Sequence, residues 1–330
     1  MRLLFIRFSS IGDIVLTSSA VRCAKKQIPG VEIHFLTKES MKDLVTNNPF
    51  IDHCHFLGND MQDTIAALKN IQFDYIIDLH HNIRTWKIKK ALGVPSFSYH
   101  KLSIQKWILA KLHFNFLPKS HVCDRYIDTL AYFKVINDGQ GLDYFFPKDY
   151  TFKASNLPTS HQAGFVAFVI GASYFNKKMP AAKWIELAQQ LKRPIVLVGG
   201  KEDATVANEI TLAAAEFVYN ACGKYDLTAS ASIIQMSQVV VSHDTGFLHV
   251  AAAFKKPTIT IWGATSPLLQ FEATYPKDTT TPHFNSMVPH LSCQPCTKQG
   301  SNHCPQAHFA CMRLQNIPSI ASKVNEFNRN

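Results

Sequence analysis

Residues 239–263 read VVVSHDTGFLHVAAAFKKPTITIWG and contain the most regular local pattern of the chain. An apolar strand ends in Ser-His-Asp, a helix begins near Thr245, and a second apolar strand follows Lys-Lys-Pro. A strand, a helix and a strand in this order predict one unit of a parallel sheet. The stretch therefore predicts an α/β fold with strands buried on both faces.

The same alternation extends over the rest of the chain. Apolar segments that end in polar or glycine turns stand at residues 3–8, 31–37, 53–57 and 73–80 in the first half, and at 164–173, 194–200 and 216–223 in the second. Segments with helical spacing separate them, at 14–26, 39–48 and 60–71 among others. We therefore predict two doubly wound, parallel-sheet domains, residues 1–150 and 151–330, joined by a linker within 137–162. Residues 313–330 are expected to form a helix that packs back towards the first domain.

The bulk composition is that of a globular protein with anionic partners. The 330 residues are 46% hydrophobic and 18% charged, with a formal net charge of +10. No apolar run is long enough for a membrane-spanning helix, and the amino terminus does not read as a secretory signal, so we expect a cytoplasmic protein. Between Asp78 and Asp124 there is no acidic residue, but there are eight basic ones: Arg84, Lys87, Lys89, Lys90, Lys101, Lys106, Lys111 and Lys119. This basic segment is either a solvated helical face or a docking surface for an anionic acceptor or for lipid headgroups.

The strongest candidate for chemistry is the turn at Asp244, Thr245 and Gly246. The free amides at the start of a helix bind phosphate, and Gly246 removes a side chain where a ligand must approach the backbone. His249 lies four residues after Thr245, on the same helical face. The alternative is an ordinary N-cap with a core-packed His249.

Two further segments of the second half carry charge. In GASYFNKKMPAAKW, residues 171–184, Ser173 ends a strand and Lys177 can bring a cation to a bound phosphate, whereas Lys178 is expected to be solvated. In VGGKED, residues 198–203, Glu202 can accept hydrogen bonds from ribose hydroxyls or simply stabilise a helix start.

In the first half, the loop FSSIGDI at residues 8–14 places Asp13 in the first turn of a helix. Its carboxylate could face the phosphate-binding loops, or it could only stabilise the helix. Neither a G-x-G-x-x-G fingerprint nor a P-loop occurs, which speaks against a nicotinamide or flavin dehydrogenase. Because Asp-x-Asp is also absent, amides, the helix dipole and Lys177 would have to meet the charge of a leaving diphosphate.

These segments, in this order, resemble glycosyltransferase family 9, the lipopolysaccharide heptosyltransferases. The matching stretches are RFSSIGDIVLTSSAVR, GASYFNKKMPAAKW, VGGKED and SHDTGFLHVAAAFKKPTITIWGATSP. The resemblance implies a GT-B fold, in which two Rossmann-like domains face a cleft. It also implies inverting transfer of a heptose, or a related sugar, from ADP-heptose or another nucleotide sugar to a lipopolysaccharide core acceptor. Such a protein would work in the cytoplasm, peripherally on the inner face of the inner membrane.

The resemblance assigns roles by position. Asp13 matches the general base, Lys177 matches the lysine that contacts donor phosphate, and Glu202 matches a ribose contact. The candidate donor-binding residues are Ser173, Lys177, Glu202, Asp244, Thr245, Gly246 and His249, and the candidate acceptor-binding residues are Ser10, Gly12, Arg84 and Lys87. Met179 and Ala264 depart from the tryptophan and proline that many members carry at these positions.

Four cysteines near the carboxyl terminus, Cys293, Cys296, Cys304 and Cys311, follow the pattern C-x₂-C-x₇-C-x₆-C. This spacing admits a structural zinc or iron–sulfur site, and equally admits reduced thiols or a disulfide-stapled loop. No cofactor is required for transfer in this interpretation.

Two rival functions stay open from the sequence. One is a nucleotide-cofactor enzyme of another class, such as a dehydrogenase or epimerase. The other is a nucleic-acid-binding protein, for which the basic segment has no recognisable binding motif and few interleaved aromatic residues.

Overall fold

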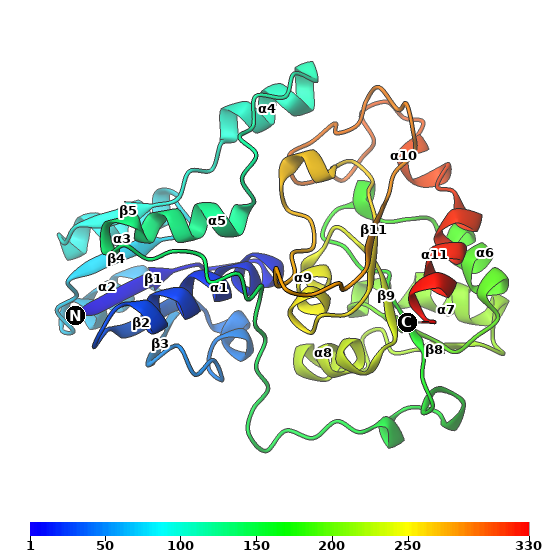
Figure 1. Ribbon diagram of the computed structural model, residues 1–330, viewed down its shortest axis with the longest axis horizontal. Coiled ribbons are helices and arrows are strands. Elements are labelled where there is room, and N and C mark those ends of the chain that lie inside the picture. The colour runs from blue at the N-terminus through cyan, green and yellow to red at the C-terminus, as the bar shows by residue number, and fades with distance from the viewer. Residues whose placement is uncertain (330) are drawn as a thin grey trace. The chain divides into compact units, whose positions relative to one another are not determined.

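The structure is a computed structural model that describes residues 1–329, and it divides into two compact units (Figure 1). The first unit comprises residues 1–101, 119–149 and 276–278, and the second comprises residues 102–118, 150–275 and 279 onwards. No helix within the described residues is long and apolar enough to cross a membrane.

The first unit contains a parallel sheet of five strands in the order β3-β2-β1-β4-β5. Its strands are β1 (Arg2–Ile6), β2 (Glu32–Lys38), β3 (His53–Leu57), β4 (Tyr75–Asp78) and β5 (Ser96–Ser98). The central strand β1 is apolar and, apart from Arg2, fully buried, as a strand covered by helices on both faces must be. The sheet order reverses at β1 and β4, and the loops after these strands are where ligands bind in such sheets.

The second unit contains a parallel sheet of six strands in the order β11-β10-β9-β6-β7-β8. Its strands are β6 (Val166–Val169), β7 (Ile195–Val198), β8 (Val218–Asn220), β9 (Val239–His243), β10 (Thr258–Ile261) and β11 (His283–Ser286). The order reverses at β9 and β6, so the turns after these two strands form the switch point of this sheet.

Helices connect the strands and cover the sheets. The first unit has α1 (Ile11–Gln27), α2 (Met61–Lys69), α3 (Ile83–Leu92) and α5 (Val122–Ile127). The second has α4 (Ser103–Leu112), α6 (Ala181–Leu191), α7 (Ala204–Ala213), α8 (Leu227–Met236), α9 (Gly246–Ala253), α10 (Ala310–Arg313) and α11 (Ile317–Phe327). Short 3₁₀ turns, η1 to η7, lie between them, including η5 (Phe175–Lys177) and η6 (Lys201–Asp203).

The nine strands predicted from apolar runs are all present, and two short edge strands, β5 and β11, were not predicted. Both missed strands are short and carry polar residues, and most of their side chains are only partly buried, so they lack the apolar run of the other strands. The predicted helix at residues 39–48 is wrong: Glu39–Leu44 forms a 3₁₀ turn with no buried residue. Without an apolar face to bury, this segment gains nothing from a longer helix.

Helix α4 and the linker differ from a simple division of the chain at residue 150. Residues 102–118, which carry α4, group with the second unit, where the Lys106 ammonium lies 4.0 Å from the Phe271 ring centroid. The first part of the predicted linker groups with the first unit, where Arg22 on α1 pairs with Asp138 at 2.8 Å and with Asp143.

The predicted carboxyl-terminal helix forms, and its apolar face is buried within the second unit. Helix α11 packs on α6, and its buried face joins the core of the second unit. That face consists of Ile317, Ile320, Ala321, Val324 and Phe327. The spacing of these residues requires burial but does not say against which surface, and the second sheet supplies it.

We predict that Arg22→Met destabilises the first unit by about 3 kcal/mol, because it leaves two partly buried carboxylates without their cation. Lys25→Met is the matched control on the same helix. Its pair with Asp52 is more exposed, so the loss should be about 1 kcal/mol or less. Urea unfolding measures both values, and equal losses would contradict the prediction.

Candidate active site residues

A polar network in the second unit surrounds Asp244, directly after β9. The Lys177 ammonium lies 2.7 Å from Asp244 Oδ2, and the Thr265 hydroxyl donates to the same oxygen at 2.8 Å. The three residues come from three different loops that follow β6, β9 and β10. The Lys177 and Asp244 side chains are only 14% and 12% exposed, so their pairing is shielded from solvent more than a surface ion pair is.

Helix α9 begins immediately after Asp244. Thr245 has extended backbone angles and makes no side-chain cap hydrogen bond, and its hydroxyl has no hydrogen-bond partner among the described residues. The first amides of the helix therefore lack a capping side chain from Thr245, and they carry the positive end of the helix dipole. His249, one turn further along α9, is buried, as the N-cap alternative also expects.

His243, which was not among the residues predicted from the sequence, links two of these loops. It is fully buried, and its Nε2 accepts a hydrogen bond from the Met179 amide at 2.9 Å. Burial lowers the pKa of His243 to about 3, so the ring is neutral and can accept this bond. His243 thus ties the end of β9 to the loop that carries Lys177. Its position between Ser242 and Asp244 was the available signal.

The prediction that Lys178 is solvated is wrong. Its ammonium lies 2.6 Å from Asp203 Oδ1, and Asp203 is buried. The other Asp203 oxygen accepts from the Gly200 amide at 3.0 Å, and a β-carbon at Gly171 would come within 2.4 Å of it. The glycine turn after β6 therefore exists to make room for this carboxylate. The other two candidate donor-binding residues, Ser173 and Glu202, are exposed.

The cysteine-bearing segment braces the loop of Thr265. The Gln294 side-chain amide donates to the carbonyls of Trp262, Gly263 and Thr265 at 3.1, 2.7 and 3.1 Å. The Cys296 amide also donates to the Ala264 carbonyl at 3.0 Å. The loop that holds Asp244 through Thr265 is therefore shaped by residues that follow it by some thirty positions.

The four cysteines of this segment are free thiols that gather in one region. None forms a disulfide. Burial, with smaller contributions from Cys296, Cys304 and Cys293, raises the pKa of Cys311 to about 12. His308 Nε2 lies 3.8 Å from Cys293 Sγ. Within residues 1–329, however, no three of these ligand atoms come within 4.8 Å of one another.

In the first unit, Asp13 occupies the first turn of α1 and is engaged on both oxygens. Arg7 NH2 lies 2.7 Å from Asp13 Oδ1, whereas the amide and hydroxyl of Ser10 donate to Oδ2 at 3.1 and 2.9 Å. The Asp13 side chain is still 28% exposed, so a ligand can reach it. Asp13 therefore stabilises the helix start and is also accessible to a ligand. The structure is thus compatible with both roles that the sequence allows, a helix-stabilising acid and a catalytic carboxylate.

Arg7 decides the charge of Asp13. Burial raises the pKa of the Asp13 carboxyl, but the Arg7 guanidinium and the Ser10 hydrogen bonds outweigh it, and the pKa is lowered overall. Arg7 is itself held by the carbonyls of Ser9 and Leu79, at 2.8 and 2.5 Å, and by the Tyr126 hydroxyl at 3.1 Å. Arg7 is a functional candidate that the sequence did not indicate, although it directly precedes the loop.

The structure separates the basic candidates of the first unit. Arg84 is exposed, and its guanidinium lies 5.2 Å from the ring centroid of Phe8, next to the end of β1. Lys87 is exposed one turn further along α3, whereas Lys89 is not free to bind a ligand, because it pairs with buried Asp78 at 2.9 Å. Of the loop residues, Ser10 is exposed and Gly12 is buried.

Comparison with known proteins matches most of the chain to one family. The family described as glycosyltransferase family 9 (heptosyltransferase) matches residues 61–306, a range that contains Lys177, Asp244 and Thr265 but not Asp13. Lipopolysaccharide heptosyltransferase 1 of Pseudomonas aeruginosa is 23% identical to this chain, over 92% of this chain and 88% of that protein.

Two solved structures share the fold. A family 9 glycosyltransferase of Veillonella parvula superposes with a TM-score of 0.77 at 18% identity and covers 99% of this chain and 97% of its own. The ADP-heptose lipopolysaccharide heptosyltransferase II of Escherichia coli superposes with a TM-score of 0.71 at 20% identity and covers 100% and 99%. At these identities the likeness shows the fold alone, two Rossmann-like sheets of the GT-B class.

We predict that Arg7→Met raises the pKa of Asp13, because burial then acts without the compensating guanidinium. In the parent chain, the lowered pKa stabilises the fold at neutral pH, and this contribution is lost as the pH falls through the pKa of the folded state. Carbon-13 NMR titration of labelled aspartate, with Asp13→Asn as the assignment control, measures the shift. An unchanged Asp13 pKa in the variant would refute the role of Arg7.

Proposed function

Because the chain belongs to glycosyltransferase family 9, we propose that it transfers a heptose, with inversion, from ADP-heptose to the core of lipopolysaccharide. A related sugar or another nucleotide donor is the nearest variant of this proposal. The observation that carries it is the network of Lys177, Asp244 and Thr265 at the start of α9. A dehydrogenase or epimerase is set aside by the family and by the missing glycine fingerprint.

The second unit would bind the donor. The amides at the start of α9 and the Lys177 ammonium are suited to the two phosphates of a nucleoside diphosphate, which need hydrogen-bond donors and positive charge. Asp244 keeps Lys177 in place before the donor arrives, and Thr265 fixes Asp244. The exposed Glu202 and Ser173 are available to the ribose and the diphosphate. His249, on α9, would donate a hydrogen bond to a phosphate oxygen of the donor.

The first unit would bind the acceptor and supply the base. Asp13 would take the proton of an acceptor hydroxyl while the hydroxyl oxygen attacks the anomeric carbon. The bond from that carbon to the diphosphate breaks in the same step, so the configuration inverts and ADP leaves with the bonding electrons. Lys177 and the α9 amides would stabilise the charge on the leaving diphosphate. Arg7 would keep Asp13 ionised between turnovers.

The exposed cations Arg84 and Lys87, with Ser10 and Gly12 of the Asp13 loop, are the proposed contacts of a phosphorylated saccharide acceptor. In this proposal the basic segment serves an anionic acceptor and lipid, so no nucleic-acid partner is needed to explain it. Lys89 is excluded from the acceptor contacts because Asp78 holds it.

We propose no metal cofactor for the transfer itself, since a lysine and backbone amides supply the positive charge that a divalent ion would bring. A structural zinc or iron–sulfur site at the four cysteines is a separate proposal. It would stabilise the segment whose Gln294 braces the Thr265 loop, and so would act on donor binding from a distance.

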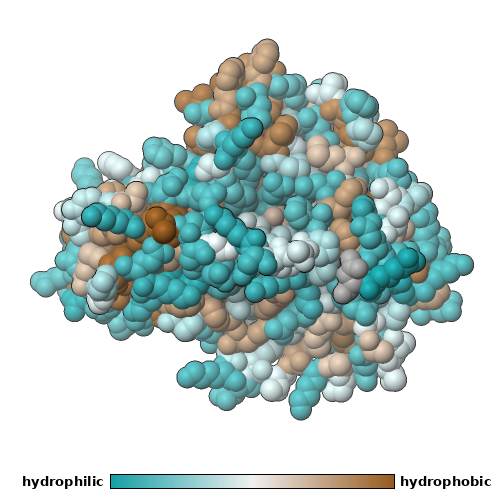
Figure 2. Space-filling view, in the orientation of Figure 1, coloured by the Kyte–Doolittle hydropathy of each residue, from teal (hydrophilic) through white to brown (hydrophobic). Residues whose placement is uncertain are grey.

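Helix α4 is the proposed contact with the inner membrane at its cytoplasmic face. The segment exposes large apolar side chains next to cations, and Figure 2 shows hydrophobic side chains gathered over this helix. The exposed apolar residues are Ile104, Trp107, Leu112, Phe114 and Phe116, and Lys111 and Lys119 are exposed in the same segment. Aromatic and apolar residues with flanking lysines are suited to an anionic lipid surface.

We predict that Asp13→Asn lowers kcat by about 10²- to 10⁴-fold while the Kd for ADP-heptose stays within a few-fold, because general-base catalysis acts on the transition state. Lys177→Ala should weaken donor binding and also lower kcat, because the ammonium would contact the diphosphate both before and during its departure. Lys183→Ala, on α6, removes a lysine that pairs with Glu186 and serves as the charge-matched control. Transfer assays and calorimetry with ADP-heptose separate the two effects, and a fully active Asp13→Asn enzyme would end the assignment.

We predict that Trp107→Ser combined with Phe114→Ser reduces sedimentation of the protein with vesicles that contain anionic lipid, because the apolar contact with the lipid is lost. Activity on a short, water-soluble acceptor should stay unchanged. The exposed Leu212→Ser on α7 is the control. If the double variant sediments like the parent chain, α4 is not the membrane contact.

A further inference from the structure

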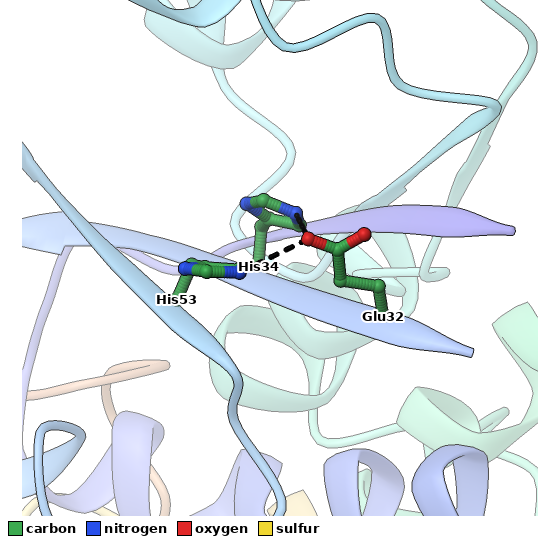
Figure 3. A group of neighbouring side chains, drawn as sticks. All are labelled: Glu32, His34 and His53. Atoms are coloured by element: carbon green, nitrogen blue, oxygen red, sulfur yellow. Dashed lines mark ion pairs between the residues drawn. The ribbon is translucent and has the colours of Figure 1, made fainter. Parts of the chain in front are cut away.

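Three potential metal ligands meet at the amino-terminal edge of the first sheet, on strands β2 and β3 (Figure 3). Glu32 begins β2, and His34 lies two residues later, so both side chains point to the same face. The register pairs His34 with His53, the first residue of β3. Strand pairing alone therefore brings the three side chains together on one face of the sheet.

The distances suit a single ion. Glu32 Oε1 lies 3.2 Å from His34 Nε2 and 3.0 Å from His53 Nε2, and all three ligand atoms lie within 4.8 Å of one another. Ligands that bind a tetrahedral zinc ion at about 2.0–2.1 Å are separated by roughly 3.3 Å. The group thus needs little rearrangement to close on an ion.

His34 supplies a second observation. Its side chain is 4% exposed, and its buried Nε2 makes no hydrogen bond among the described residues, although the Glu32 oxygen is within ion-pair range. The other ring nitrogen, Nδ1, lies 2.9 Å from His55 Nε2. A partner on the far nitrogen is what fixes the ring of a metal-binding histidine, so His55 would orient His34.

The protonation states are those of metal ligands. Burial lowers the pKa of His34, with a further contribution from His53, and lowers the pKa of His55 to about 4. The Arg2 hydrogen bond at 3.0 Å holds Glu32 Oε2 and lowers the pKa of Glu32. At neutral pH the carboxylate is therefore ionised and the His34 ring is neutral, and with the ring proton on Nδ1, facing His55, Nε2 can offer its electron pair to an ion.

We propose that Glu32, His34 and His53 bind one divalent transition-metal ion of the zinc type, with water completing its coordination. Two imidazoles and one carboxylate favour zinc over magnesium or calcium, which prefer oxygen ligands. The site joins the edge strand β3 to β2 and lies at the amino ends of these strands, whereas Asp13 follows the carboxyl end of β1. Its role is structural, and the proposal does not depend on the transferase function.

The first test compares zinc binding by the full chain, without a histidine tag and stripped of metal, with that of His53→Gln. The His53 side chain is half-exposed, so this variant should fold. His100→Gln, an exposed histidine of the same unit, is the matched control. We expect His53→Gln to bind one equivalent less zinc, or to bind it about tenfold more weakly or worse, and to show a smaller zinc-induced rise in Tm than the parent and the control.

Cobalt(II) distinguishes this site from the four cysteines. Thiolate ligands give cobalt a charge-transfer absorption in the near ultraviolet, whereas a site of histidine and carboxylate gives only weak visible bands. We expect His53→Gln and Glu32→Gln to remove visible intensity without changing the thiolate absorption. Equal zinc stoichiometry, affinity and cobalt spectra in the parent chain and both variants would overturn the proposal.

Discussion

The ion pair between Lys177 and Asp244 is the interaction on which the candidate site of the second unit depends. It joins the loop after β6 to the loop after β9, the two strands at which the sheet order reverses. Thr265 adds the loop after β10 through the same carboxylate oxygen. Without this shared oxygen, the cation and the start of α9 would have no fixed relation, and the proposed diphosphate ligand would have to order them at the cost of its own binding energy.

Further contacts, made by residues outside the proposed donor site, hold these loops in place. Buried, neutral His243 accepts from the Met179 amide, and the Lys178–Asp203 pair fills the space that the glycine turns leave open. Gln294 satisfies three carbonyls of the 262–265 loop. None of these residues is a proposed contact of the nucleotide sugar. They restrict the movement of the loops that carry the proposed contacts. A preorganised site of this kind binds charge without reorganising when the reaction occurs.

The first unit uses the two edges of its sheet differently. At the carboxyl edge, Arg7 sets the charge of Asp13 and is itself anchored on two carbonyls and on Tyr126. At the amino edge, β2 and β3 present the histidines and Glu32. Parallel strands align like ends, so one sheet can keep the proposed base, Asp13, and a cluster of metal-ligand type at opposite ends without interference between them.

The sequence by itself determined the nine apolar strands, the α/β class, the family resemblance and the loops that carry Asp13, Lys177 and Asp244, because strand periodicity and helix starts are local signals. It did not determine which side chains and helices contact one another. The pairing of Lys177 with Asp244, of Lys178 with Asp203 and of Arg7 with Asp13, the docking of α11 on α6, and the meeting of Glu32 with His53 were decided by the tertiary structure. Apart from the Arg7–Asp13 pair, these contacts join residues far apart in the chain, and only strand order and register bring such residues together.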